Sequence, residues 1–199
     1  SYGFRPNRSA ENAIARATSL INLSKLHYVV DVHIEGFFDN IDHSKLLKQI
    51  WSMGIRDKRL ICIIGKMLKC EVMGYGIQRK GTPQGGILSP LLSNIVLNEF
   101  DWWISDQWET FETRHNYVLI RNESNGRIRY DRSGTYRALK KNSKLKEMFI
   151  VRYADDFKIF CRDYKTANKC FEASKLWLGD RLKLNVSPEK SKITNIRKG

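Results

Sequence analysis

The sequence has little proline and no long apolar run. Four of its 199 residues are proline and 42% are hydrophobic, which excludes a collagen-like or low-complexity chain. The densest apolar run covers residues 60–64 only, whereas a membrane-spanning helix needs about 20 residues. The first residues carry no signal-peptide pattern, and the chain begins with Ser1 rather than methionine. We therefore expect a globular piece of a longer polypeptide, without a membrane partner.

Cysteine is also scarce, and its spacing excludes a zinc knuckle. The four cysteines are Cys62, Cys70, Cys161 and Cys170. Their spacings of eight and nine residues contain no CxxC pair. Unpaired cysteines of this kind are typical of buried small side chains in a reducing compartment, so we expect all four to be buried.

Acidic residues are outnumbered by basic ones. Lysine and arginine together number 35 and aspartate and glutamate 21, which gives a net charge of +14. Such an excess indicates a polyanionic partner, most often a nucleic acid. The alternative is an ordinary basic surface without a specific partner. The stretch from Arg127 to Lys146 is especially rich in arginine and lysine.

Hydrophobic periodicity predicts an α+β fold with an antiparallel sheet. Helices are expected over residues 7–23, 44–53, 58–69, 88–108 and 164–182. Strands are expected over residues 27–34, 71–78, 148–153, 157–161 and 192–196, with a hairpin around Asn125-Gly126. Along the first strand, Val30, Val32 and Ile34 share one face and Val29, Asp31 and His33 share the other.

Two adjacent carboxylates, Asp155 and Asp156, lie at a tight turn between two apolar strands. Neighbouring carboxylates repel each other unless a divalent cation lies between them and a phosphate. The alternative is that aspartate is present simply because it is a good turn residue.

Two further segments have a composition suited to nucleotide binding. Residues 81–86 combine three glycines with a proline, and Gln84 offers a donor and an acceptor at the tip of this loop. In residues 33–43, a strand ends at Gly36 and two aromatic residues follow, so backbone amides could hold a triphosphate and Phe38 could face a sugar. The alternatives are an ordinary turn before a helix and two phenylalanines in the core.

These segments together resemble group II intron-encoded reverse transcriptases, also called maturases. The chain contains five blocks in that family's order: SYGFRPNRSA at 1–10, GFFDNIDH at 36–43, GTPQGGILSPLLSNIVLNEFD at 81–101, YADD at 153–156 and LNVSPEKSKI at 184–193. YADD alone would be a weak signal, but five ordered blocks over nearly the whole chain are specific.

The resemblance implies a right-hand polymerase palm with part of the fingers. Residues 1–30 would belong to the fingers and residues 31–199 to the palm, with helices and a hairpin that connect the two over 43–79; the thumb and the maturase domain would lie elsewhere. The implied activity is RNA-templated DNA synthesis with two magnesium ions. The implied partners are intron RNA, an RNA template with a DNA primer, and deoxynucleotide triphosphates. A homodimer stays open, and the location would be a prokaryotic cytoplasm or an organellar matrix.

The resemblance also assigns residues by matching position. Asp155 and Asp156 would bind metal, Gln84 would lie against the incoming nucleotide, and Phe38 would exclude a ribose 2′-hydroxyl. The backbone around Gly36 would hold the triphosphate, and Arg5 would contact nucleotide or template. The implied substrate-binding set is Ile34, Glu35, Gly36, Phe37, Phe38, Gln84, Lys190 and Arg5.

One position departs from the family pattern. The family has an aspartate five residues before the aromatic gate, but here that position is His33. Magnesium prefers oxygen ligands to imidazole. Asp31 lies on the same strand face, but roughly 6.6 Å away. Either His33 is an inactivating change, natural or engineered, or Asp31 takes over through a local rearrangement; we favour the first.

The leading hypothesis is therefore the fingers–palm part of an RNA-directed DNA polymerase, impaired by His33. A second hypothesis is a non-catalytic splicing cofactor whose palm is a scaffold and whose basic surface binds intron RNA. The third is a basic globular domain in which the motifs occur by chance.

Overall fold

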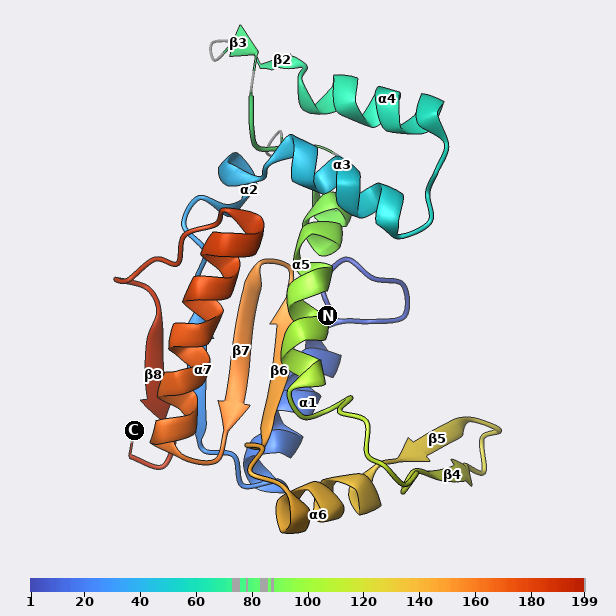
Figure 1. Cartoon of the computed structure of the whole chain (residues 1–199), viewed down its shortest axis with the longest axis vertical. Coiled ribbons are helices and arrows are strands. Elements are labelled where there is room, and N and C mark those ends of the chain that lie inside the picture. The colour runs from blue at the N-terminus through green and yellow to red at the C-terminus, as the bar shows by residue number, and fades with distance from the viewer. Residues whose placement is uncertain (73–75, 78, 83–85, 87, 199) are drawn as a thin grey trace.

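A four-stranded antiparallel sheet forms the centre of the molecule (Figure 1). The computed structural model describes residues 1–72, 76–77, 79–82, 86 and 88–198. The strand order is β6-β7-β1-β8. The strands are β1 (Tyr28–Val32), β6 (Met148–Tyr153), β7 (Asp156–Cys161) and β8 (Lys192–Asn195). Because β1 is central, its residues pair with β7 on one side and with β8 on the other.

Helices cover both faces of this sheet. The helices α5 (Ser89–Asp106) and α7 (Tyr164–Trp177) pack on one face, and a π-helical turn, Leu178–Leu182, extends α7. The helices α1 (Ala10–Asn22) and α6 (Ser133–Asn142) contribute to the core on the other face. The strand alternation explains both layers, since Val30 and Val32 point to the α5 side and Val29 to the α1 side. The predicted α+β fold, antiparallel sheet and face assignment are thus confirmed.

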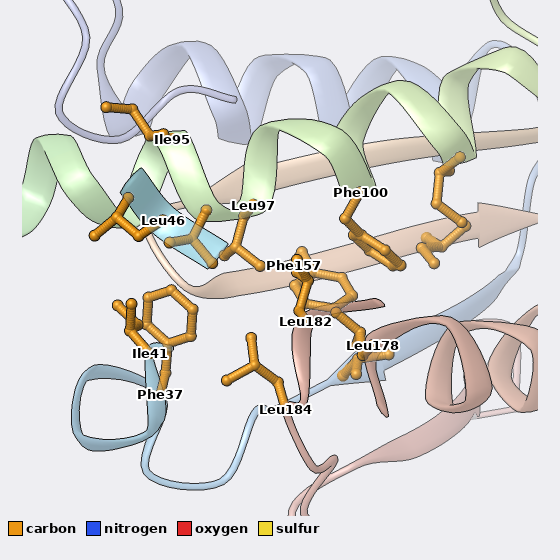
Figure 2. Close-up of a cluster of buried hydrophobic side chains, with 14 of the residues drawn as sticks. Phe37, Ile41, Leu46, Ile95, Leu97, Phe100, Phe157, Leu178, Leu182 and Leu184 are labelled. Atoms are coloured by element: carbon orange, nitrogen blue, oxygen red, sulfur yellow. The ribbon is translucent and has the colours of Figure 1, made fainter. Parts of the chain in front are cut away.

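Aromatic rings fill the core between the sheet and the α5 side. The Phe100 ring lies 4.9 Å from Phe157 and 5.4 Å from Trp177, measured between ring centroids. Figure 2 shows Phe100 and Phe157 pointing toward each other, with Leu178 and Leu182 beside them. All four side chains are almost completely buried. This contact fixes α5 and α7 on the strand that begins with Asp156.

A smaller set of elements extends from each end of the sheet (Figure 1). At one end lie α2 (Phe37–Asn40), α3 (His43–Ser52), α4 (Lys58–Leu68) and the short strands β2 (Glu71–Val72) and β3 (Gly76–Ile77). At the other end, α6 and the hairpin of β4 (Leu119–Asn122) and β5 (Ile128–Asp131) project. The sequence predicted this hairpin with strands over 117–121 and 127–130, and the observed strands begin two residues and one residue later, respectively.

Several expectations for the peripheral elements were wrong. The single strand expected over 71–78 is instead two paired two-residue strands, with 73–75 and 78 outside the described residues. Cys62 and Cys70 are exposed, because α4 turns one side to solvent, whereas Cys161 and Cys170 are buried as expected. The sequence also gave no indication of α6 or α2. Helix α6 carries few apolar residues and α2 has only four residues, so neither has a hydrophobic periodicity that predicts a helix.

The proposed division into fingers and palm does not coincide with a break in the described structure. The boundary at residue 30 falls within β1, and α1 packs on the same sheet as the rest of the chain. Among the described residues, no helix is both long and apolar enough to cross a bilayer.

The core predicts a specific response to truncation of Phe100. Phe100→Ala should lower the free energy of unfolding by about 3–5 kcal/mol, because it empties a fully buried ring site between two layers. The matched control is Trp102→Ala on the same helix, whose side chain is 57% exposed and which should cost less than about 1 kcal/mol. Urea denaturation measures both values. Equal losses for the two variants would show that the Phe100 cluster does not hold α5 to the sheet.

Candidate active site

The two carboxylates lie on a tight turn that joins the edge strand β6 to the central strand β7. Tyr153 pairs with Asp156 at the end of the ladder, so only Ala154 and Asp155 lie between the strands. Ala154 adopts a left-handed backbone with φ of 57° and is buried. The Asp156 side chain is 69% exposed and Asp155 is half-buried. The turn therefore presents both carboxylates at the sheet edge, where solvent and a ligand can reach them.

His33 lies directly against this turn. Val32 of β1 pairs with Phe157, so the next residue along β1 comes beside Asp156. Nδ1 of His33 lies 3.1 Å from Oδ1 of Asp156, and Nε2 lies 3.5 Å from Oδ1 of Asp31. The imidazole thus lies between two carboxylates and can donate to both when it is protonated.

Asp31 is engaged by a second partner. It pairs across the strands with Lys158, whose Nζ lies 2.5 Å from Oδ2 of Asp31. The Asp31 side chain is 17% exposed. Its charge is therefore already balanced by an ammonium group on the neighbouring strand. Lys158 had not been singled out in the sequence, although its position two residues after Asp156 places it on the same face of β7.

The donor set fits magnesium only in part. The carboxylate oxygens of Asp155 and Asp156 are the hard ligands that magnesium prefers, whereas the nearest third group is an imidazole. Across the described part of the chain, no group of three or more His, Cys, Asp or Glu side chains is arranged to hold a metal ion. The site as it stands has two suitable ligands and does not fit a two-ion centre.

The last sequence block supports the backbone of His33. The His33 amide donates to Oγ of Ser191 at 3.0 Å, and its carbonyl accepts from the Ser187 amide at 2.8 Å. The Glu35 amide donates to the Asn185 carbonyl at 2.8 Å, beside a bridge between Ile34 and Val186. Lys190, which the resemblance assigns to substrate binding, is exposed one residue from Ser191. The structure thus brings the Lys190 segment to the candidate site.

The glycine-rich loop begins against the Phe37-Phe38 segment. The Thr82 amide donates to the Phe38 carbonyl at 2.7 Å, and a Cβ at Gly81 would lie 2.9 Å from that same oxygen. Only glycine therefore permits this approach. Phe37 is buried, whereas Phe38 is half-buried and its ring lies edge-on to Phe37 at 5.2 Å. The proposed gate ring is the accessible one of the pair, and Gln84 lies outside the described residues.

Polar contacts that sequence reasoning missed hold these two segments together. His43 is buried, and its Nε2 lies 2.6 Å from the Gly81 carbonyl oxygen. Lys80 donates from Nζ to Oδ1 of Asn40 at 2.6 Å. Asn40 in turn donates to the Gly36 carbonyl at 3.0 Å, next to the left-handed turn at Gly36. Motif reading selected the aromatic residues of this block and overlooked its polar ones.

Asp42 caps α3 beside the same segment. Its Oδ1 accepts from the Lys45 amide at 2.8 Å, and Nζ of Lys183 lies 3.3 Å from Oδ2. The Lys45 hydrogen bond, followed by the Lys183 contact, lowers the pKa of Asp42. A lowered pKa in the folded state means that this cap stabilises the protein at neutral pH and is lost as the pH falls through that value.

A buried arginine fixes the Asp155-Asp156 turn from beneath. The Arg152 side chain is 1% exposed and forms two hydrogen bonds with the Asp101 carboxylate, at 2.8 and 2.7 Å. Its Nη1 also donates to Oδ1 of Asn94 at 3.0 Å and to the Ala154 carbonyl at 2.6 Å. The turn is thereby joined to two side chains of α5 through a single guanidinium.

The N-terminal block packs on the same turn. The Tyr2 amide donates to the Arg152 carbonyl at 2.8 Å. A Cβ at Gly3 would lie 2.5 Å from the Ala154 nitrogen, so the close approach requires glycine. The Phe4 ring lies 6.3 Å from Tyr153, and Arg5 is exposed next to it. Arg5 therefore follows directly on a residue that packs beside the turn, and its contact with nucleotide or template stays a prediction.

Comparisons with known proteins agree with this arrangement. Residues 1–198 match the family described as reverse transcriptase (RNA-dependent DNA polymerase). The chain belongs to the reverse transcriptase family. The expected resemblance to group II intron-encoded reverse transcriptases is confirmed, because the group II intron-encoded protein LtrA of Lactococcus lactis is 33% identical over 98% of this chain and 37% of LtrA.

Other relatives are similar over nearly the whole of this chain. Protein YkfC of Escherichia coli K12 is 31% identical over the whole chain and 52% of YkfC, so the chain spans about half or less of these relatives. Among solved structures, a telomerase of Candida tropicalis matches 94% of this chain and 34% of its own, with a TM-score of 0.56 and 13% identity. That likeness shows a shared reverse transcriptase fold.

Because the Arg152–Asp101 pair is buried, replacing one partner should destabilise the protein much more than replacing both. Arg152→Met should lower the free energy of unfolding by about 3–5 kcal/mol, because it leaves a carboxylate uncompensated, and Asp101→Leu added to it should recover most of that loss. The control, Arg121→Met, breaks the exposed pair with Asp131 and should cost at most about 1 kcal/mol. Chemical denaturation of Arg152→Met, Asp101→Leu, the double variant and Arg121→Met decides it. Additive losses at Arg152 and Asp101 would contradict the pairing.

Proposed function

We propose that this chain forms the nucleotidyl-transfer region of a group II intron-encoded RNA-directed DNA polymerase. The observation that carries the proposal is the convergence of the Asp155-Asp156 turn, His33 at the end of β1 and the segment 185–191 within one reverse transcriptase fold. Since the chain covers half or less of its curated relatives, the thumb and maturase functions of the whole protein are part of the proposal.

The proposed reaction extends a DNA primer on an RNA template. The primer 3′-hydroxyl oxygen attacks the α-phosphorus of a deoxynucleotide triphosphate, the bond to the bridging oxygen breaks, and pyrophosphate leaves. Divalent ions, when bound, supply charge stabilisation at the attacking and leaving oxygens, and Asp155 and Asp156 would hold them. Backbone amides of residues 34–38 would orient the triphosphate, and the half-buried Phe38 ring would face the sugar.

We expect His33 to weaken DNA synthesis by this chain. Its Nδ1 lies 3.1 Å from the Asp156 carboxylate, so a protonated ring neutralises the group that would otherwise attract a cation. The third carboxylate of the family pattern is replaced by a nitrogen ligand that magnesium disfavours. Asp31 does not compensate in this arrangement, because Lys158 already pairs with it.

A non-catalytic role in splicing is the second candidate, and His33 favours it. In that case the palm is a scaffold, and the net charge of +14 serves binding of intron RNA. A Candida albicans telomerase with the same fold, at a TM-score of 0.54, was solved with a fragment of telomeric RNA, which supports RNA as a partner here. A prokaryotic cytoplasm or organellar matrix is the location proposed with either role.

Restoring the carboxylate should restore the polymerase. In the full-length protein, His33→Asp should raise primer extension on an RNA template by about 100-fold or more, since a carboxylate that bridges both divalent ions acts on both at once and lowers the barrier by about 3 kcal/mol or more. Asp31→Asn in the restored protein should change the rate much less. Side-by-side extension assays of the four combinations test this. Efficient synthesis with His33 that Asp31→Asn abolishes would identify Asp31 as the ligand instead.

Phe38 should control the choice of sugar. In a protein with activity, Phe38→Ala should increase incorporation of ribonucleotides relative to deoxynucleotides, because the ring no longer blocks the 2′-hydroxyl. Phe37→Leu is the control, since Phe37 is 3% exposed and should affect stability rather than selectivity. Competitive primer extension measures the ratio. If Phe38→Ala left the ratio of ribonucleotide to deoxynucleotide incorporation unchanged, Phe38 would be a core residue without a role in sugar selection.

A further inference from the structure

A row of basic side chains lies along the exposed side of α6 and just beyond its end. The basic stripe comprises Arg137, Lys140, Lys141 and Lys144, all exposed. Lys140 forms an ion pair with Glu147 at 3.0 Å. Within the described ranges, no carboxylate forms an ion pair with the other three. Arg137, Lys140 and Lys141 lie within about 6 Å of helix rise, and Lys144 follows the end of α6, so the stripe presents four positive charges to a phosphate backbone.

The helix that carries this stripe is anchored firmly. Thr135 and Leu139 are buried on its inner side. The Tyr136 ring stacks on Trp108 at 6.0 Å and lies edge-on to Phe149 at 5.6 Å. The stripe is therefore presented by a packed element and not by a loose loop, so its charges keep a fixed spacing.

The neighbouring hairpin adds further positive charge. Arg121 and Arg129 lie opposite each other in its ladder, and Arg127 lies two residues before Arg129, just outside β5. Arg121 is paired with Asp131 and Arg129 lies 4.0 Å from Glu123, whereas Arg127 is exposed. Over residues 111–147 the chain has ten basic and four acidic residues, so this end of the molecule has a strong local positive charge.

This basic end lies far from the catalytic turn. In Figure 1, α6 and the hairpin are at the end of the sheet where β6 begins, and the turn is at the end where β6 stops. The six residues of β6 separate the two by about 17 Å. A template and primer seated at Asp155 and Asp156 would therefore not need the stripe for their own charge balance.

We propose that the basic stripe and the hairpin arginines form a second nucleic-acid surface that holds the phosphate backbone of base-paired RNA. The inference rests on the proposed function in taking RNA as the partner, and it adds a separate anchoring site. Charge complementarity favours a polyanion. The four residues of the stripe include no aromatic ring on which single-stranded bases could stack, and surfaces for single strands depend on such rings; the exposed ring of Tyr130 belongs to the hairpin.

The test removes the stripe and compares it with an equal loss of charge elsewhere. The stripe variant carries Arg137→Gln, Lys140→Gln, Lys141→Gln and Lys144→Gln. The control variant carries Lys165→Gln, Lys169→Gln, Arg181→Gln and Lys198→Gln, four exposed positions. Both full-length variants are titrated with a stable RNA hairpin and with oligouridine of equal length, at several salt concentrations.

The stripe variant should bind the hairpin RNA about 30-fold more weakly at 0.1 M salt, and its salt dependence should fall by a slope of about 3. The control variant should lose much less affinity for the RNA hairpin. The affinity of the stripe variant for oligouridine should also change much less. Equal weakening by both variants would reduce the effect to net charge and overturn the proposal. A change of oligomeric state in the stripe variant, seen by light scattering, would assign the surface to protein contacts and also overturn it.

A separate readout distinguishes this proposal from the proposed function. In a protein restored with His33→Asp, the four substitutions of the stripe variant should leave the extension rate on a short, preformed primer–template unchanged. Its affinity for the RNA hairpin should fall. If no variant extends a primer, the polymerase proposal fails. The titration with the RNA hairpin still tests whether the stripe binds base-paired RNA.

Discussion

A buried guanidinium determines where the Asp155-Asp156 turn lies. Arg152 is enclosed by Asp101, Asn94 and the Ala154 carbonyl, so its charge is fully compensated by groups on α5 and on the turn itself. Burying an ion pair is costly, and its geometry must be well satisfied to be tolerated. The consequence is positional: the turn cannot move relative to α5 without breaking several charge-assisted hydrogen bonds. Gly3 closes the same arrangement from the N-terminal block.

The register of β1 against β7 is the second constraint. With Val32 opposite Phe157, the residue after Val32 must lie beside Asp156 whatever its chemistry. An aspartate there would complete a set of three carboxylates, whereas His33 forms a bridge between Asp156 and Asp31. The fold thus retains the geometry of a polymerase palm, and we propose that the side chain at position 33 decides the chemistry that this geometry supports.

Local patterns predicted the parts of this structure that depend on sequence neighbours. The alternation in β1, the apolar strands around YADD and the five ordered blocks identified the sheet, the turn and the family. Long-range polar partners could not be predicted in this way. Arg152 and Asp101 are 51 positions apart, and arginine is ordinarily a surface residue, so nothing nearby indicates the pair. Helix α6 was missed because only Thr135 and Leu139 form its buried side.

The central claim is that the turn and the end of β1 form one cation site that lacks a ligand at position 33. Paramagnetic broadening of backbone amide signals by manganese, a magnetic substitute for magnesium, tests this directly on the chain and on its His33→Asp variant. The account predicts broadening confined to residues 31–34 and 153–157, at a manganese concentration at least about tenfold lower in the variant. Equal affinity in the two proteins, or broadening centred elsewhere, would contradict it.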